Sequence, residues 1–202
     1  IFQLYLPHPI GILFLYLFGF YFLIISLEID YRLAIIGAIS FGFSSYFFII
    51  IEAGHNTKAH SIGYLAPILA SVLMVYRGKL FLGASLTALF SALMINANHL
   101  QITYYLVILL LVVGVVHLIK AINEKKFSLF LKQSVFLIVA GLLGSLTSSS
   151  KLLSTIEYGE QSIRGKSELT SNEEVKTTGL DKDYATAWSY GLSESFLSLI
   201  HI

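Results

Sequence analysis

The sequence lacks cysteine and is poor in charge. No disulfide bond and no thiolate chemistry can arise from its 202 residues, because none of them is cysteine. Charged residues make up 12% of the chain, whereas a soluble globular domain carries about 25%. Aliphatic and aromatic residues account for 56%, and the mean hydropathy is +0.78. These values exclude an ordinary soluble domain and indicate a polytopic membrane protein, for which the bilayer is the main solvent.

Several motifs of common enzymes and of nucleic-acid-binding proteins are also missing. The chain has no glycine-rich phosphate loop, no serine nucleophile elbow, no zinc-protease pattern and no nucleic-acid-binding motif. We therefore expect no nucleic-acid partner.

Six apolar runs predict membrane-spanning helices. A span needs roughly 20 apolar residues as helix, and backbone groups in lipid must be hydrogen-bonded within their own segment. The sequence therefore predicts an all-α fold. The expected spans are residues 9–27, 33–51, 61–76, 80–95, 102–119 and 130–146.

The lysine and arginine residues between these runs predict their orientation. Cytoplasmic loops of membrane proteins carry the excess of such residues. One set of loops holds most of them, and the opposite set holds Lys58 alone. The rich set consists of Arg32, Arg77, Lys79, Lys120, Lys125, Lys126 and Lys132. We expect this set to face the cytoplasm, and the turns around residues 52–60 and 96–101 to face outward.

The composition changes after residue 146. Residues 147–202 are polar over most of their length and then enter another apolar run. We interpret residues 1–146 as the transmembrane region and residues 147–202 as an extracytoplasmic segment, because six spans return the chain to the side on which it started. The chain begins at Ile1 without a signal peptide and ends inside an apolar run. We therefore expect it to be an internal piece of a longer protein.

Polar residues gather on the two outward turns. They are Glu52, His55, Asn56, Lys58 and His60 on the first turn, and Asn96, Asn98, His99 and Gln101 on the second. One interpretation is structural: Gly54 would end a helix, and Asn56 or Thr57 would cap the next. Asn98 and Gln101 likewise resemble a capping box. Capping needs only one or two polar residues a turn, so the surplus favours a functional site.

The chemistry of these residues suits an anion. Lys58 with His55 or His60, and the N–H groups at a helix start, are typical of a phosphate site. A second basic pair, Arg164 and Lys166, lies in the predicted outer segment and could converge there.

A metal site is the alternative. Glu52, His55, His60 and His99 offer possible ligands at one membrane face. However, His55 and His60 are five residues apart, which does not place them on one face of a helix. We assign no metal ligand and no cofactor, and the use of a divalent metal stays open.

Four segments carry a resemblance to a known family. They are "EAGHNTKAHSIGYLAPILA", "NANHLQITYYL", "RGKSEL" and "GLDKDYATAWSYGLSES", in that order. As a set they resemble the YfhO-type bacterial multi-pass membrane proteins, over most of the chain. The resemblance implies a membrane glycosyltransferase of the GT-C type in the bacterial cytoplasmic membrane. Such enzymes take a sugar from a polyprenyl-phosphate donor and transfer it, at the outer face, to a cell-envelope glycan or polymer.

The resemblance also implies roles for residues. The acidic catalytic residue of such enzymes follows their first span, and we expect this chain to begin after that point. The catalytic residue is therefore unassigned, with Glu52 as a weak candidate. The expected substrate-binding residues are His55, Asn56, Lys58, His60, Asn96, Asn98, His99, Gln101, Arg164 and Lys166.

Two other classes of protein stay open. A lipid or small-solute transporter would bind its substrate at polar residues midway along the spans, yet the six apolar runs carry almost no charge. A non-catalytic scaffold subunit of an envelope complex would use the outer segment as its contact surface, and nothing in the sequence excludes it.

Overall fold

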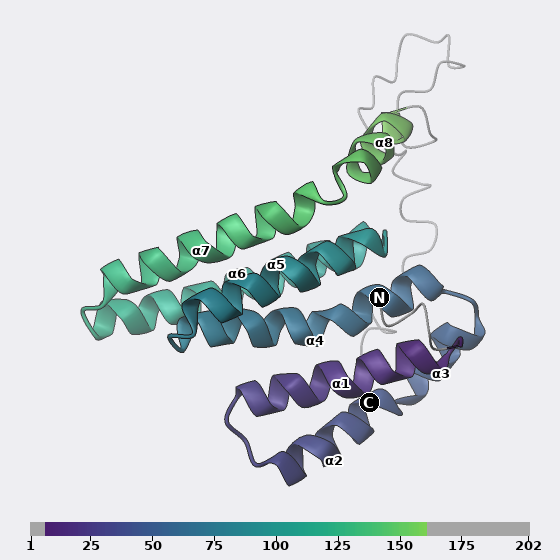
Figure 1. Cartoon of the computed structure of the whole chain (residues 1–202), viewed down its shortest axis with the longest axis horizontal. Coiled ribbons are helices and arrows are strands. Elements are labelled where there is room, and N and C mark those ends of the chain that lie inside the picture. The colour runs from purple at the N-terminus through teal and green to yellow at the C-terminus, as the bar shows by residue number, and fades with distance from the viewer. Residues whose placement is uncertain (1–6, 161–202) are drawn as a thin grey trace, which may run out of the picture. The chain divides into compact units, whose positions relative to one another are not determined.

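The computed structural model describes residues 7–160, and all regular structure in that range is helical (Figure 1). This confirms the predicted all-α fold for the described part of the chain. Within it, helices follow one another through short turns. They are α1 (Ile10–Ser26), α2 (Tyr31–Gly42), α3 (Ser45–Glu52), α4 (Asn56–Tyr76), α5 (Leu80–Asn96), α6 (Leu100–Asn123), α7 (Phe127–Leu146) and α8 (Ser149–Glu160).

The chain divides into two compact units. The first is Ile1–Ser149 and contains α1 to α7, and the second is Ser150–Ile202 and contains α8 except for its first residue. In α8 the apolar side chains of Leu153 and Ile156 are exposed. All the sites described below belong to the first unit.

Helix α4 is the centre of the first unit and lies between α1 and α5 (Figure 1). It also contacts α3, α6 and α7, and most of its residues are buried. Small residues permit the close approach: a Cβ on Gly19 of α1 would lie 2.9 Å from Cδ of Pro67 in α4. On the other side, a Cβ on Gly83 of α5 would lie 2.7 Å from the carbonyl oxygen of Ser71. Small residues at helix contacts are typical of association within a membrane.

Three described helices, α4, α6 and α7, are long and apolar enough to cross a membrane. The bent pair α2 and α3 would add a fourth span, whereas α1 and α5 are apolar but have only 17 residues each. Helices α6 and α7 expose large apolar side chains such as Leu111 and Leu142. Apolar residues on all sides of a helix that is not buried in protein indicate contact with lipid.

The apolar run 33–51 is not the single helix that we predicted. It is divided between α2 and α3, whose axes differ by 42°. Ser44, before α3, has an extended backbone with φ −59° and ψ 136°. The bend brings the rings of Phe41 and Phe47 to 4.8 Å from each other, and both rings pack on Tyr16. This aromatic packing stabilises the bend.

The other predicted runs coincide with helices, and all of these except α1 extend beyond the predicted bounds. Helix α4 begins at Asn56 rather than at residue 61, so Lys58 and His60 are helical. Helix α6 continues to Asn123, beyond the predicted end at residue 119. Backbone hydrogen bonds do not require apolar side chains, so a helix can continue where its chain leaves the apolar layer.

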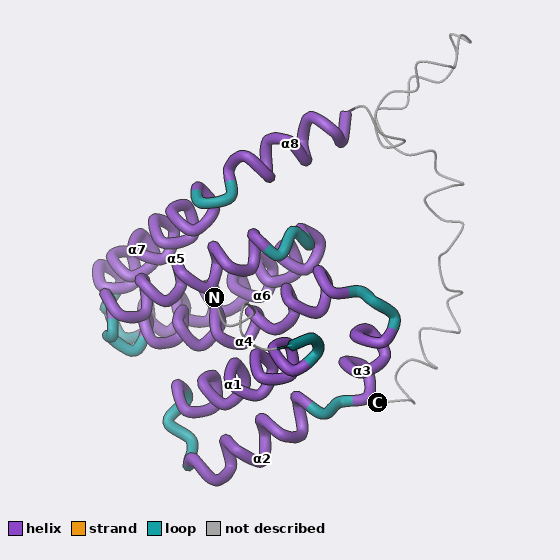
Figure 2. Tube along the Cα trace, turned by 45° about the vertical axis from the view of Figure 1, so that its right-hand side comes forward, coloured by secondary structure: helices purple, strands orange, loops and turns teal. Residues whose placement is uncertain are grey.

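The turns of the first unit gather at two ends (Figure 2). At one end, the Arg77 guanidinium donates hydrogen bonds to the carbonyl oxygens of Ser26 and Leu27. It also lies 3.6 Å from a carboxylate oxygen of Glu28. This joins the α1–α2 turn to the α4–α5 turn, and the α6–α7 turn lies at the same end. We call it the basic end, defined by Arg77, Lys79, Lys120, Lys125 and Lys126, and we call the opposite end the histidine end, defined by His55, His60 and His99.

Candidate functional site

The turn between α3 and α4, at the histidine end, is held by hydrogen bonds to Asn56. Nε2 of His8 donates to Oδ1 of Asn56 over 2.9 Å, and Nδ1 of His60 donates to its backbone oxygen over 2.7 Å. Gly54 has a φ of 74°, the left-handed conformation expected where a helix ends. Asn56 is the first residue of α4 rather than its N-cap. His8 was not predicted as a site residue, because an isolated histidine carries no signal of its distant partner.

Side-chain capping of the helix N-termini does not account for the polar residues of the two turns. The N-cap positions of α4 and α6 are occupied by His55 and His99, and neither side chain makes a capping hydrogen bond. Asn98 has a φ of 60° and precedes the N-cap. Gln101 donates to the hydroxyl of Tyr105 over 2.8 Å instead of to the backbone. Side-chain N-capping by Asn56 and Asn98 is therefore wrong, whereas Asn98 directly follows the C-cap Ala97 and ends α5 in the left-handed conformation, as Gly54 does after α3.

Apolar packing brings the second turn against the first. Ile102, in the first turn of α6, packs on a buried cluster that includes Ile51 of α3 and Ala59 of α4. The buried hydroxyl of Tyr16 donates to the carbonyl oxygen of Ala59 over 2.9 Å, which ties the start of α4 to α1. Both polar turns consequently lie at the same end of the unit.

Lys58 supplies a positive charge at this end. Its Nζ lies 5.4 Å from the ring centre of Tyr46, a cation–π contact. In residues 7–160 no carboxylate forms an ion pair with Lys58. Glu52 is exposed at the end of α3, and Asn96 is exposed at the end of α5. The charge of Lys58 is therefore available to an anion.

Two buried polar atoms at the start of α6 have no hydrogen-bond partner in the described part of the chain. They are Nδ1 of His99 and Oγ1 of Thr103. His99 is the N-cap of α6, and Thr103 is in the first turn of the helix. Buried polar groups are almost always hydrogen-bonded, and these two atoms mark a place that a polar ligand could occupy. Thr103 was not predicted, because a threonine in an apolar helix commonly bonds back to its own backbone.

The possible metal ligands are not assembled. Among residues 7–160, no three histidine, aspartate or glutamate side chains lie close enough together to hold a metal ion. Glu52, His55, His60 and His99 therefore do not form a metal-ligand cluster. Arg164 and Lys166, predicted to converge on this surface, lie outside the described residues.

An apolar cavity of about 730 Å³ lies among α4, α5, α6 and α7. It follows α6 from Thr103 to Leu118, a distance of about 22 Å at 1.5 Å per residue. Tyr76 and Phe130 line its other end, towards the basic end. The cavity therefore extends over most of the thickness of a hydrocarbon layer, which is about 30 Å.

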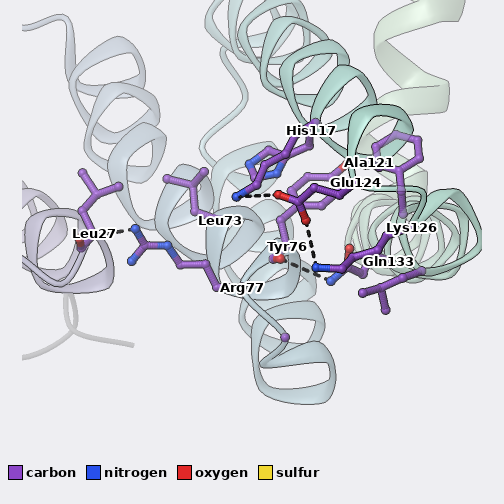
Figure 3. Close-up of a pocket in the computed structure, with 13 residues that line it drawn as sticks. Leu27, Leu73, Tyr76, Arg77, His117, Ala121, Glu124, Lys126 and Gln133 are labelled. Carbon is purple, nitrogen blue, oxygen red and sulfur yellow. Dashed lines mark hydrogen bonds and ion pairs between the residues drawn. The ribbon is translucent and has the colours of Figure 1, made fainter.

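A second pocket, of about 480 Å³, lies at the basic end and shares Tyr76 and Phe130 with the cavity. The carboxylate of Glu124 pairs with two lysines. Its Oε2 is 2.9 Å from Nζ of Lys126 (Figure 3), and its Oε1 is 3.9 Å from Nζ of Lys120. The hydrogen bond from Lys126 and its positive charge lower the pKa of Glu124.

The walls of this pocket are fixed by contacts between helices. Nε2 of Gln133, from α7, donates to the carbonyl oxygen of Val75 over 2.9 Å and so ties α7 to the end of α4. The rings of Tyr76 and His117 stack with their centres 4.2 Å apart. The sequence did not predict this pocket, because its basic residues had served only to orient the spans.

The chain was compared with protein-family models, with curated proteins and with solved structures, and none of them matches it.

Proposed function

We propose that this chain is part of a membrane glycosyltransferase of the GT-C type, with six spans and an active site at the outward-facing histidine end. The donor is a sugar on polyprenyl phosphate, and the acceptor is a cell-envelope glycan or polymer. The observation that supports this proposal is that the starts of α4 and α6, with Lys58 and His99, converge among polar side chains that make no N-capping hydrogen bond.

In this mechanism the chain holds the departing phosphate. An acceptor hydroxyl oxygen attacks C1 of the donor sugar, and the bond between C1 and the phosphate oxygen breaks. Negative charge accumulates on that oxygen, where Lys58 and His55 stabilise it. The hydroxyl proton passes to a carboxylate, which belongs to an acidic residue outside the described part of the chain, with Glu52 as the weaker candidate.

The uncharged polar groups position the donor. Asn98 and Gln101 are exposed beside the N-terminus of α6 and offer amide groups to sugar hydroxyls. Nδ1 of His99 and Oγ1 of Thr103 would gain the hydrogen-bond partners that they lack. Satisfying such atoms with ligand favours binding, because an unpaired buried polar group costs about 1–3 kcal/mol.

No observation favours a transporter. Among the described helices that qualify as single spans, α4, α6 and α7, charged residues occur only near the ends: Lys58 in α4, Lys120 in α6 and Lys132 in α7. A carrier binds its cargo near the middle of the membrane, commonly with ionisable or unwound segments there.

Transfer of a labelled sugar tests the proposal. Membranes that contain the full-length protein are supplied with radiolabelled polyprenyl-phosphate sugars, and the label is followed into envelope polymer. We expect Lys58→Ala and His55→Ala to reduce transfer about tenfold or more, because charge stabilisation in the transition state is lost. Lys132→Ala, an exposed lysine of α7, is the matched control and should leave transfer unchanged.

Two results would contradict the proposal, and each would refute a different part of it. Normal transfer by Lys58→Ala and His55→Ala, at equal protein levels, would refute the assigned phosphate site. No transfer by the wild-type protein with any donor would refute the enzymatic activity and favour a scaffold.

A further inference from the structure

The apolar cavity is suited to a hydrocarbon chain. Its volume of about 730 Å³ lies within the range of pockets that hold small ligands, about 300–1,000 Å³. Three of the hydroxyls in its lining already have partners. The hydroxyl of Thr87 bonds to Ser71, that of Ser134 to Tyr76, and that of Ser145 to the Gly141 carbonyl. The hydroxyl of Thr103, which has no partner in the described part of the chain, lies at the end of the cavity towards the histidine end, so the rest of this wall offers few polar groups to a ligand.

The cavity is open towards the surroundings of the helices. Leu111 and Val115 of α6 line it and are also exposed, as are Ile138 and Leu142 of α7. In a membrane these side chains border lipid. A chain that belongs to a bilayer lipid can therefore enter from the side, without crossing water.

The basic end supplies charge where the cavity ends. The adjoining pocket is lined by Arg77, Lys120 and Lys126 against one carboxylate, Glu124. Three positive groups meet Glu124 in the pocket and Glu28, which lies 3.6 Å from the Arg77 guanidinium, so one positive charge is in excess and the pocket favours an anion. The guanidinium of Arg77 is held by the backbone of the α1–α2 turn (Figure 3), and guanidinium groups suit phosphate oxygens.

We propose that the first unit binds one anionic glycerophospholipid, with its phosphate in the pocket at the basic end and one acyl chain in the apolar cavity. The phosphate lies between Arg77 and the lysines and competes with Glu124 for them. In the predicted orientation the basic end faces the cytoplasmic leaflet, where anionic lipids attract basic side chains. The phosphate pocket is separate from the proposed active site, which lies at the opposite end of the helices, and the cavity reaches that end only at Thr103.

Retention of lipid by the purified protein tests this proposal. The full-length protein is placed in bilayers with equal amounts of phosphatidylglycerol and phosphatidylethanolamine of identical chains, extracted in mild detergent and weighed by native mass spectrometry. We expect one phosphatidylglycerol to be retained in preference. Lys120→Ala should lower its retention about fivefold, the effect of one lysine near anionic lipid. Glu124→Gln should raise its retention, because a competing carboxylate is removed.

A cavity-filling variant distinguishes binding of a whole lipid, with its acyl chain in the cavity, from binding of the headgroup alone. A Cβ on Gly141 would meet nothing within 4 Å, so Gly141→Leu should fill the cavity without disturbing the fold and abolish retention. Leu143→Phe, on the exposed face of α7, and Lys132→Ala are the matched controls. Equal retention of both lipids, unchanged retention in Gly141→Leu, or the same loss in Lys132→Ala as in Lys120→Ala would overturn the proposal.

Discussion

At the scale of single residues, the polar groups of the described helices divide by whether the protein satisfies them. Tyr16, Thr87 and Gln133 are bonded to neighbouring helices. His99 and Thr103 each retain a buried atom without a partner in the described part of the chain. The first kind stabilises the arrangement of helices, and the second kind marks where a ligand is expected, because unpaired polar groups are costly in an apolar surrounding.

The hydroxyl of Tyr16 tests whether a polar group that is bonded to a neighbouring helix stabilises the fold. Tyr16→Phe removes the buried hydrogen bond to Ala59 and keeps the aromatic packing. We expect a loss of about 1 kcal/mol of unfolding free energy, measured by denaturant titration in detergent. Tyr104→Phe is the matched control, because that ring is exposed. Equal effects of the two variants would contradict the role given to Tyr16.

Glu124 gives a prediction about pH. Its pKa lies below the ordinary 4.5, first because of the hydrogen bond from Lys126 and then because of that residue's charge. A carboxylate with a lowered pKa stabilises the folded state above its unfolded pKa. That contribution is lost as the pH falls through the folded pKa. Lys126→Ala should therefore raise the pKa of Glu124 in an NMR titration, whereas Lys132→Ala should not; an unchanged value in Lys126→Ala would show that the ion pair is absent in solution.

At the scale of helices, close contacts at small residues hold α4 against its neighbours. A Cβ on Gly83 would lie within 2.8 Å of backbone atoms of α4, and backbone cannot move aside as a flexible side chain can. A Cβ on Gly141 would meet nothing within 4 Å. Gly83 therefore has no room for a side chain and Gly141 has, a difference that the sequence alone does not reveal.

Substitution by alanine separates these two glycines. We expect Gly83→Ala to cost about 1–3 kcal/mol, because it forces α4 and α5 apart. Gly141→Ala should be neutral or should stabilise by about 0.5–1 kcal/mol, since alanine is the better helix former. Unfolding midpoints in detergent measure both variants. A destabilisation of equal size at the two positions would contradict the packing described for α4.

The sequence predicted helices better than it predicted their ends and contacts. Long apolar runs are a strong signal, and each coincides with helix in the structure. The break at Ser44 was missed because the run 33–51 was interpreted as one span, although Gly42, Ser44 and Ser45 are residue types that often end or begin helices. The packing of Phe41 and Phe47 on Tyr16 accompanies the break. The start of α4 was missed because polar residues were taken as the end of the apolar layer.

The sequence predicted which polar residues belong to the candidate site, but it predicted only part of their spatial arrangement. The surplus of polar residues on two turns was visible in the sequence, and so was the alternation of the turns between two ends. The bond of His8 to Asn56 and the unpartnered atom of Thr103 depend on contacts between helices, which no local pattern encodes. The pocket at the basic end was missed for the same reason: charges on separate turns do not reveal that they share one cavity.

At the scale of the first unit, the proposals share one spatial requirement. The turns with His55 and His99 must face one side of the membrane, and the turns with Arg77 and Lys126 must face the other. The contacts of Arg77 with the α1–α2 turn and of Ile102 with α3 and α4 support this grouping. Orientation rests on the excess of lysine and arginine at the basic end.

Labelling of single cysteines tests this requirement most directly, and the absence of native cysteine removes any background from these 202 residues. Exposed positions are available at both ends: Thr57 and Gln101 at the histidine end, Lys79 and Ser128 at the basic end. Each is replaced by cysteine in the full-length protein and treated with a membrane-impermeant thiol reagent in intact cells. We predict labelling of Thr57→Cys and Gln101→Cys in intact cells, and of Lys79→Cys and Ser128→Cys only after permeabilisation. Labelling of Thr57→Cys and Gln101→Cys from opposite sides, or of both only after permeabilisation, would contradict an outward-facing active site at the histidine end.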